Sequence, residues 1–249
     1  MREWVVGRNP VRETIRAGRR HIFQLYVAEG IKETATTLEA MKILGEKSIP
    51  VKHIRRDELD SLGPNHQGLA LQVGAYPYFG LNQILSNAGS RNEPPFILIL
   101  DSLQDPQNLG TLLRTAEAVG VHGIIIPQNN SAKITPAVVS ASSGACEHLT
   151  IVQANLVASM RELKEHNIWI LGLANDPNGT TPAATNFGGG IGLVVGSEGE
   201  GMRRLVAESC DLILRLPMVG KIESLNAAVA GSIALYLIYQ ARSAISGAI

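Results

Sequence analysis

Two hydrophobic patterns alternate along most of this chain. Short runs are apolar at almost every position, such as FILIL at 96–100 and GLVVG at 192–196, and such runs are typical of strands buried on both faces of a parallel sheet. Between them lie stretches in which apolar residues recur every three or four positions, as in amphipathic helices. The alternation from residue 96 onward predicts an α/β fold built on a parallel sheet.

The same pattern sets the expected elements of this part of the chain. We expect strands at Phe96–Asp101, Gly123–Ile126, Leu149–Val152, Trp169–Ala174, Gly192–Gly196 and Leu212–Leu216. We expect helices at Gly110–Val119, Pro136–Ser142, Leu156–His166, Arg203–Glu208 and Ser224–Ser243. Because sheets of this kind bind ligands beyond the carboxyl ends of their strands, the loops that follow the strands form the candidate site.

The first 75 residues predict a smaller α/β unit. We expect its first helix to begin at an Asn9 cap followed by Pro10, and to end at Gly18. Further elements are expected at Phe23–Val27, Thr34–Leu44, Val51–Ile54 and Leu69–Val73. Residues 76–95 hold three prolines around a short helix, Leu81–Ala88, and we interpret them as a linker. The predicted domains are therefore 1–75 and 96–249, joined by 76–95.

Composition narrows the class of protein. The chain has 249 residues, 45% of them hydrophobic and 18% charged, which argues against disorder. The start, MREWVVGRNP, lacks the apolar core of a secretory signal. The uncharged stretch Ser224–Gln240 is interrupted by polar residues and glycine, so we expect a buried helix and no membrane span. Cys146 and Cys210 form no CxxC pair and fit reduced thiols in a cytoplasmic protein.

Charge is distributed unevenly although the net charge is zero. Residues 1–75 carry a net charge of +3 and the remainder −3. Five arginines and one acidic residue lie between Arg8 and Arg20, and the spacing of Arg12, Arg16 and Arg19 places these three on one helix face. An anionic partner would meet this part of the chain first. The alternative interpretation is an ordinary solvated helix face.

Three strand-end loops carry the residues that could do chemistry. In the first, Asn108 could cap a helix, and Arg114 follows in a largely apolar helix, either as a structural ion-pair partner or as a contact to an RNA phosphate or hydroxyl. The second, Gly196–Gly201, lacks both GxGxxG and GK[ST] and contains two glutamates. It is either a plain tight turn or the cradle of a neutral or cationic ligand, because glutamates repel phosphate.

The third loop runs from Leu216 to Asn226. Ser224 and Asn226 either cap the last helix or face a pocket shared with the second loop. The six histidines show no metal-binding spacing, no Ser-His-Asp arrangement or nucleophile elbow is apparent, and no carboxylate pair has glycosidase character. Metal and hydrolase chemistry therefore have little support, and we expect no metal.

Taken together, the loops resemble the three signature motifs of the SpoU (TrmH) family of SPOUT methyltransferases. The matching segments are NLGTLLRTAEAVG, VVGSEGEGM and LPMVGKIESLNAAVA, in that order. GRNPVRETI and NHQGLALQV further resemble the substrate-binding domain, of ribosomal-protein L30e type, of bacterial 23S ribosomal RNA guanosine-2′-O-methyltransferases. One departure is Gln104, where the family often has an acidic residue.

The resemblance implies a parallel-sheet SPOUT domain with a C-terminal trefoil knot, preceded by a small L30e-like α/β domain. It also implies bound S-adenosylmethionine and a homodimer whose active sites take residues from both subunits. The cofactor contacts it implies are Gly196, Leu216 and Leu225, with Met218 and Ser224 close by. The catalytic set it implies is Asn108, Arg114, Glu198, Ser224 and Asn226.

The expected activity is 2′-O-methylation of a ribose, of guanosine, in 23S ribosomal RNA, with the backbone of the RNA contacting Arg12, Arg16 and Arg19. A tRNA guanosine methyltransferase and a non-catalytic RNA-binding ribosome-assembly protein are the alternatives, and the lack of GxGxxG disfavours a dehydrogenase. The family mechanism is usually drawn with the arginine as general base. Because an arginine side chain holds its proton far above neutral pH, we expect Arg114 instead to orient the hydroxyl and stabilise developing negative charge.

Overall fold

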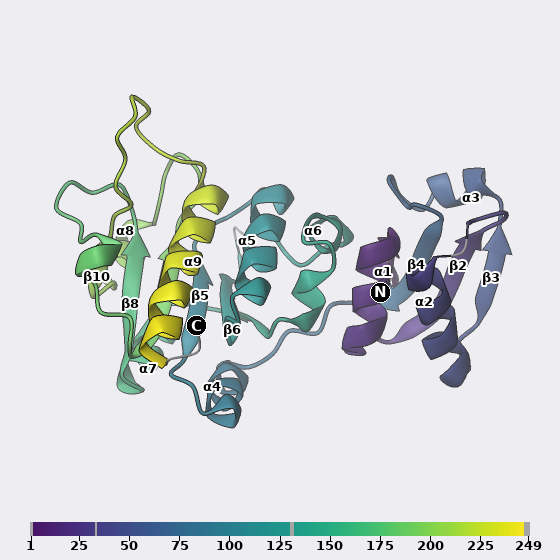
Figure 1. Ribbon diagram of the computed structural model, residues 1–249, viewed down its shortest axis with the longest axis horizontal. Coiled ribbons are helices and arrows are strands. Elements are labelled where there is room, and N and C mark those ends of the chain that lie inside the picture. Colours follow the sequence, from purple (N-terminus) through teal and green to yellow (C-terminus); the bar gives the residue numbers. More distant parts are fainter. Residues whose placement is uncertain (1, 33, 130–131, 247–249) are drawn as a thin grey trace. The chain divides into compact units, whose positions relative to one another are not determined.

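Contacts divide the chain into two compact units in the computed structural model, which describes residues 2–32, 34–129 and 132–246 (Figure 1). The first unit comprises Met1–Pro77 together with Lys133–His148, and the second comprises Tyr78–Ala132 together with Leu149–Ile249. The hydrophobic pattern assigns residues 133–148 to the second domain, whereas their contacts lie with the first unit.

The first unit is built on a mixed sheet. Its strands are β1 (Arg2–Val6), β2 (Ile22–Ala28), β3 (Val51–Ile54) and β4 (Leu69–Gly74), in the order β1-β4-β2-β3. Only β2 and β3 are parallel. Its helices are α1 (Arg8–Ala17), α2 (Ala35–Glu46) and α3 (Arg56–Asp60). The sequence pattern missed β1, whose first two residues are charged, and α3, which is a single short turn of charged residues and one buried leucine.

The start of α1 differs from the expectation, and its end agrees with it. The helix begins at Arg8 and its N-cap is Gly7, whose φ of 100° turns the chain sharply out of β1. Asn9 lies inside the first turn and makes no cap. At the other end Gly18 has a φ of 62° and donates its N–H to the carbonyl of Thr14, as a left-handed helix cap does.

Residues 133–148 join the first unit through a buried ion pair. This segment contains α6 (Pro136–Ala141) and a short 3-10 helix, η1 (Ala145–His148). The Nη1 atom of Arg20 lies 3.1 Å from Oε1 of Glu147, and both side chains are fully buried. Arg20 also pairs with Glu3, and the hydroxyl of Tyr76 donates to the carbonyl of Cys146 over 2.9 Å. Burial raises the pKa of the Glu147 carboxyl, and Arg20 opposes that rise.

Arg20 therefore does not belong to a basic surface. The sequence groups it with the other arginines between residues 8 and 20, but its side chain is enclosed by glutamates and by the backbone carbonyl of Gly74. A buried charge needs such partners because transfer out of water is costly.

The second unit has the parallel sheet that the sequence predicts. Its strands are β5 (Phe96–Leu100), β6 (Gly123–Pro127), β7 (Ile151–Ala154), β8 (Ile168–Leu173), β9 (Gly190–Val195) and β10 (Leu212–Leu214). The strand order is β10-β8-β9-β5-β6-β7, and every pairing is parallel. The strands are buried along nearly their whole length, which explains their continuous apolar pattern.

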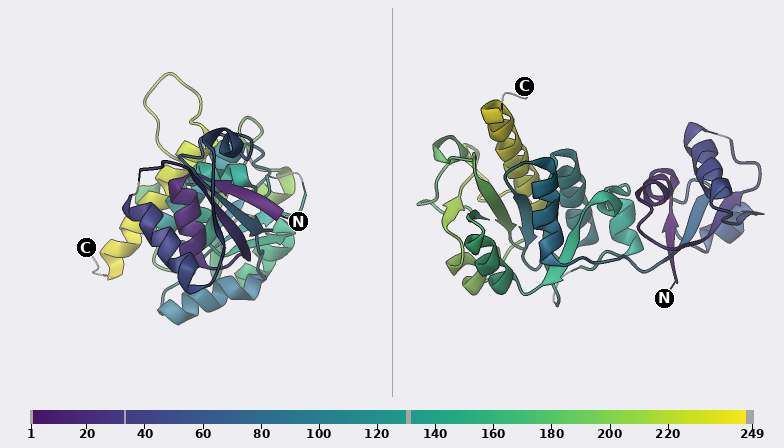
Figure 2. Two further views of the ribbon diagram at one scale, coloured as in Figure 1. Left: turned by 90° about the vertical axis from the view of Figure 1, so that its right-hand side faces the viewer. Right: turned by 90° about the horizontal axis from the view of Figure 1, so that it is seen from below.

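Helices cover both faces of this sheet (Figure 2). On one face lie α4 (Leu81–Arg91), α7 (Leu156–Glu165) and α8 (Arg204–Glu208), which share an apolar core with the strands. On the other face α5 (Pro106–Ala118) packs beside α9 (Ala227–Ser246). The two come close at Gly231, where a Cβ would stand 2.6 Å from the side chain of Leu112. A short 3-10 helix, η2 (Pro182–Ala184), precedes β9.

Helix α9 is buried on one side only, contrary to the expectation of a buried helix. Val229, Ile233 and Tyr236 are 46%, 40% and 51% exposed and fall on one stripe. By length and composition alone, Ala227–Ile245 is also apolar enough to cross a membrane. Core helices of globular proteins meet the same test, and the inner side of α9 packs on α5 and on the sheet.

Both cysteines are free thiols. Burial raises the pKa of Cys146 to about 12 and that of Cys210 to about 11. Neither thiol is therefore ionised at neutral pH, and neither is activated as a nucleophile.

Candidate active site

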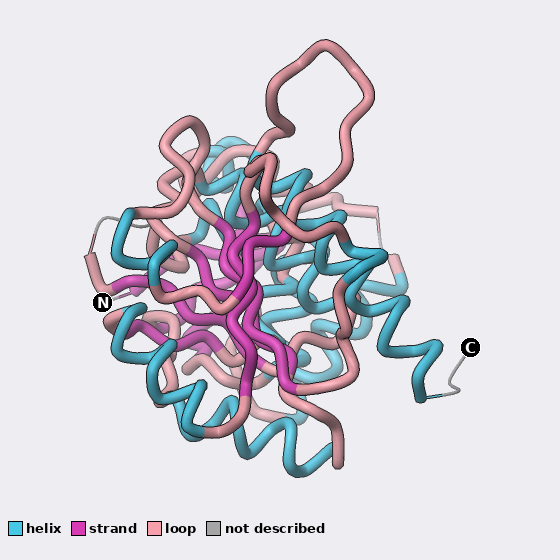
Figure 3. Tube along the Cα trace, turned by 90° about the vertical axis from the view of Figure 1, so that its left-hand side faces the viewer, coloured by secondary structure: helices cyan, strands magenta, loops and turns pink. Residues whose placement is uncertain are grey.

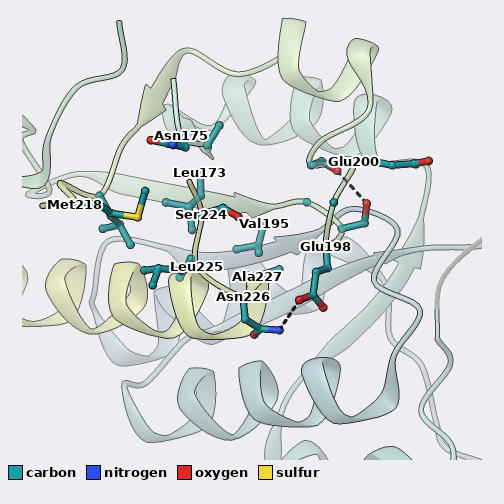
Figure 4. Close-up of a pocket in the computed structure, with 17 residues that line it drawn as sticks. Leu173, Asn175, Val195, Glu198, Glu200, Met218, Ser224, Leu225, Asn226 and Ala227 are labelled. Atoms are coloured by element: carbon teal, nitrogen blue, oxygen red, sulfur yellow. Dashed lines mark hydrogen bonds between the residues drawn. The ribbon is translucent and has the colours of Figure 1, made fainter. Parts of the chain in front are cut away.

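A cavity of about 420 Å³ opens at the carboxyl ends of β8, β9 and β10 (Figure 4). This is the edge of the sheet where ligands are expected to bind. The residues that line it come from the ends of these strands, from the two loops that follow β9 and β10, and from the start of α9. They are Leu173, Ala174, Asn175, Val195, Gly196, Ser197, Glu198, Gly199, Glu200, Gly201, Leu216, Met218, Ser224, Leu225, Asn226, Ala227 and Ala230.

The loop after β9 is a tight turn that only glycine allows at Gly196. A Cβ there would lie 2.2 Å from the carbonyl carbon of Gly201, because the chain folds back on itself. Ser197 and Gly201 exchange two backbone hydrogen bonds of 2.9 and 3.0 Å. Gly199 and Gly201 have φ angles of 88° and 70°, which also favour glycine. The turn presents Glu198 and Glu200 beside the cavity.

The loop between β10 and α9 projects away from the sheet (Figures 1 and 3). Its middle is fully exposed at Val219, and its far end is tethered where the amide of Asn175 donates to the carbonyl of Glu223 over 2.6 Å. Both ends of the loop return to the cavity and contribute the apolar side chains of Leu216, Met218 and Leu225.

Three predicted side chains meet in one hydrogen-bonded group. The Asn108 amide donates to Oε2 of Glu198 over 3.1 Å. The Asn226 amide donates to Oε1 of Glu198 over 3.1 Å and to Oδ1 of Asn108 over 3.2 Å. The carboxylate of Glu198 is thus held on both oxygens by residues from two other loops, as Figure 4 shows for Asn226. Hydrogen bonds to a charged acceptor are stronger than those between neutral groups.

Of the three residues expected to cap the helices beside this group, only Asn226 does so. Asp105, not Asn108, caps α5 by accepting the N–H groups of Gln107 and Asn108. Asn226, not Ser224, caps α9 by accepting the N–H groups at 228 and 229. The Asn108 side chain is consequently available to Glu198, while Asn226 serves both the helix and Glu198. Ser224 lines the cavity and is exposed.

Arg114 stands apart from the residues that line the cavity. It lies on the exposed side of α5, and it is not among the residues that line the cavity. Six residues separate it from Asn108, which is about 240° around a helix, so the two side chains leave α5 in different directions.

The three arginines expected to contact RNA all lie in the first unit. Nε of Arg12 is 2.7 Å from Glu13, and Arg16 makes a bidentate pair with Glu39 at 2.7 and 3.0 Å. Arg16 and Arg19 are exposed, and Arg12 is half-buried. Arg19 lies beyond the end of α1 at Ala17, so it does not share a helix face with Arg12 and Arg16 as expected. The positive charge of Arg12 and Arg16 is partly offset by neighbouring glutamates.

Sequence reasoning missed one wall of the cavity and one anchor beside it. Leu173, Ala174 and Asn175 at the end of β8 line the cavity. The polar Asn-Asp-Pro-Asn-Gly turn that follows this strand was the available signal. The anchor is Asp101, whose buried carboxylate accepts both the backbone N–H and the Nε of Arg203 over 2.7 Å. Among the described residues no group of three His, Cys, Asp or Glu side chains could hold a metal ion.

Family models match both parts of the chain. Residues 95–236 match the SpoU rRNA Methylase family, and residues 4–79 match the RNA 2′-O ribose methyltransferase substrate-binding domain. The chain belongs to the SpoU (TrmH) family of RNA 2′-O-methyltransferases.

Full-length relatives carry the same family name. A TrmH family tRNA/rRNA methyltransferase of Bacillus subtilis (strain 168), YacO, is 39% identical over 97% of this chain and 96% of its own length. A TrmH family tRNA/rRNA methyltransferase of Staphylococcus aureus (strain MSSA476) is 38% identical over 96% of each chain.

Solved structures confirm the α/β SpoU methyltransferase fold. The SpoU methyltransferase AviRb of Streptomyces viridochromogenes, solved with AdoMet, matches with a TM-score of 0.80 and 22% identity, over 98% of this chain and 91% of its own. The TrmH/SpoU tRNA modifying enzyme of A. aeolicus matches with a TM-score of 0.56 and 25% identity, over 62% of this chain and 78% of its own.

We expect Gly196→Ala to open the turn after β9. The new Cβ cannot stay 2.2 Å from Gly201, so the free energy of unfolding should fall by about 1–3 kcal/mol, or roughly 3–10 °C in the thermal midpoint. Hydrogen exchange at the amides of Ser197 and Gly201 should speed up. Gly189→Ala is the matched control, because nothing lies within 4 Å of the Cβ position there. Equal stability of the two variants would contradict this account of the turn.

Proposed function

We propose that this protein transfers a methyl group from S-adenosylmethionine to the 2′-hydroxyl of a guanosine ribose in 23S ribosomal RNA. The observation that carries the proposal is the Asn108–Glu198–Asn226 group at the mouth of the cavity. It combines the three loop motifs of the family in one place.

The cavity suits S-adenosylmethionine by size and by chemistry. Its volume of about 420 Å³ lies in the range of roughly 300–1,000 Å³ common for small-molecule sites. Leu216, Met218 and Leu225 offer an apolar surface for a purine ring, and backbone groups of the turn at Gly196 can read the edge of the ring. Glu198 and Glu200 favour a cationic ligand over a phosphate.

The residues of this chain position the reacting groups. When bound, S-adenosylmethionine supplies an electrophilic methyl group on a sulfonium sulfur, which leaves as a neutral thioether. The ribose 2′-oxygen forms the new C–O bond as the methyl–sulfur bond breaks, so the hydroxyl must lie in line with the departing sulfur, and its proton passes to solvent water. Holding that alignment accounts for much of the rate. We assign this role to Ser224 and the Glu198 group, because Ser224 and Glu198 line the cavity.

The position of Arg114 supports an active site shared between two subunits. Arg114 is exposed on α5 and is not among the residues that line the cavity of its own chain, while α9 beside α5 exposes the apolar stripe of Val229, Ile233 and Tyr236. Such a stripe is typical of a surface that a second copy covers. In a dimer formed through α9, Arg114 of one subunit would serve the cavity of the other, where it orients the hydroxyl and stabilises developing negative charge.

The first unit favours ribosomal RNA over tRNA as the substrate. The likeness to the rRNA methyltransferase of Sinorhizobium meliloti covers 96% of this chain, with a TM-score of 0.77 and 20% identity. The likeness to the A. aeolicus tRNA modifying enzyme covers only 62%. The additional unit carries the substrate-binding family match and the arginines at 12, 16 and 19, which would contact the RNA backbone.

The decisive experiment is methyl transfer from tritiated S-adenosylmethionine to unmodified 23S ribosomal RNA and, separately, to unmodified tRNA. We expect label on the ribose of a guanosine in the 23S RNA. Label on tRNA would support the proposed reaction but overturn the proposed substrate. Tight RNA binding without transfer to either RNA would favour a non-catalytic assembly role.

We expect Arg114→Ala to abolish turnover and to leave the affinity for S-adenosylmethionine nearly intact. The side chain acts on the hydroxyl and not on the cofactor, so a loss of 10²–10³ in kcat, about 3–4 kcal/mol, is the order expected for removing a stabilising donor. Equilibrium dialysis measures the cofactor affinity, and single-turnover assays measure the rate. A large loss of cofactor affinity in this variant would contradict the assigned role.

Mixing two inactive variants tests the shared active site. Arg114→Ala alters helix α5 and Glu198→Ala alters the turn after β9. A heterodimer of the two variants therefore contains one intact site if the arginine comes from the partner subunit. After subunit exchange we expect about a quarter of wild-type activity, because half of the dimers are mixed and each has one working site. If Arg114 serves the cavity of its own chain, the mixture stays as inactive as either variant alone.

A further inference from the structure

A second cavity lies on the same sheet edge and has no part in the site described above. Its volume is about 570 Å³, and it opens at the carboxyl ends of β6 and β7, beside the first turns of α7 and α8. The residues that line it are Pro127, Gln128, Asn129, Ala154, Asn155, Leu156, Val157, Arg203, Arg204, Leu205 and Val206.

The two cavities differ in charge. The first is lined by Glu198 and Glu200. The second is lined by two arginines and three side-chain amides, and no acidic residue is among the residues that line it. An anionic ligand is therefore repelled from the first cavity and attracted to the second.

Arg203 is fixed in place with part of its guanidinium still available. Its backbone N–H and Nε both donate to the buried carboxylate of Asp101 at the end of β5. The side chain remains 50% exposed, and within the described part of the chain its two Nη groups make no hydrogen bond. Arg204 is 79% exposed and makes a single surface pair with Glu208, of the kind that contributes little.

The rest of the lining suits a nucleotide. Leu205 is 58% exposed, which offers an apolar face to a base, while Gln128 and Asn155 supply amide groups to its polar edge. The first residues of α7 also line this cavity, where the helix N-terminus adds a partial positive charge, although the side-chain oxygen of Asn155 already accepts the N–H of Ala158. A phosphate on the arginines with a base on Leu205 would use each of these features.

The two cavities are neighbours along the chain. The turn Gly196–Gly201 forms one wall of the first cavity, and Arg203 follows it after a single residue. In the sheet, β5 lies between β9 at the first cavity and β6 at the second. At about 4.8 Å per strand, these two strand ends are about 10 Å apart, which a short length of RNA strand can span. A methyltransferase that acts on one ribose must also hold the strand next to that ribose.

We infer that the cavity formed by Arg203, Arg204 and Leu205 at the ends of β6 and β7 binds a flanking nucleotide of the RNA strand that carries the methylated ribose. This inference rests on the proposed function, because it presupposes an RNA substrate at the first cavity. It assigns to the second unit a contact with RNA that is separate from the arginines of the first unit.

The test uses Arg204→Glu in the full-length protein, with Arg161→Glu as the control. Arg161 is an exposed residue of α7 outside the cavity, so both variants change the charge of the same unit equally. The probes are unmodified 23S ribosomal RNA and unmodified tRNA. Filter binding over a range of salt concentrations gives the affinity and its salt dependence, and methyl transfer gives KM and kcat.

We expect Arg204→Glu to raise the RNA Kd and KM about tenfold, as loss of a charge-assisted phosphate contact does. The slope of log K against log salt should shrink by about one unit, a change that a merely structural defect does not produce. The kcat at saturating RNA and the affinity for S-adenosylmethionine should stay unchanged, and Arg204→Lys should keep the wild-type slope.

The outcomes separate this inference from the proposed function. If wild-type protein binds and methylates RNA but Arg204→Glu behaves like Arg161→Glu, the second cavity is not an RNA site and the proposed function stands. If wild-type protein neither binds nor methylates either RNA, the proposed function and this inference are both overturned.

Discussion

Parallel strand pairing is the constraint on which the site depends. Because all six strands of the second unit run the same way, every loop that follows a strand emerges at one edge. Segments that are distant in sequence, around residues 108, 198 and 226, are therefore brought together by the pairing of the strands alone. The Asn108–Glu198–Asn226 hydrogen bonds then fix the positions of those loops relative to one another.

The polar groups at this edge are divided between stabilising the fold and serving the site. Asp105 and Asn226 satisfy the first N–H groups of α5 and α9, and Asp101 anchors the backbone of Arg203. Glu198, in contrast, is exposed and its carboxylate bonds only to the two asparagine amides among the described residues. Asp101 and Asp105 thus serve the fold, whereas Asn226 both caps α9 and donates to Glu198.

The sequence predicted the strands of the second unit well because burial on both faces leaves a continuous apolar run, as at Phe96–Leu100. It placed the helix starts less well. At the start of α5 both Asp105 and Asn108 are good capping residues, and local pattern does not tell which one the loop geometry selects. The loop motifs located most of the cavity, but the wall at Asn175 depends on the pairing of β8 beside β9, which no local pattern encodes. The roles of the site residues, the domain boundaries, the dimer and the trefoil knot stay predictions.

The packing of residues 133–148 on the first unit has a practical consequence for dividing the protein into parts. A fragment that ends at Pro77 would lose Glu147 and leave the fully buried Arg20 with Glu3 as its only carboxylate partner among the described residues. A fragment that starts at Tyr78 would keep Glu147 without its arginine. Stranding a buried charge in this way costs several kcal/mol. The first unit is therefore built from two separate segments of the sequence, and its stability depends on both. A single cut in the chain does not yield two intact halves.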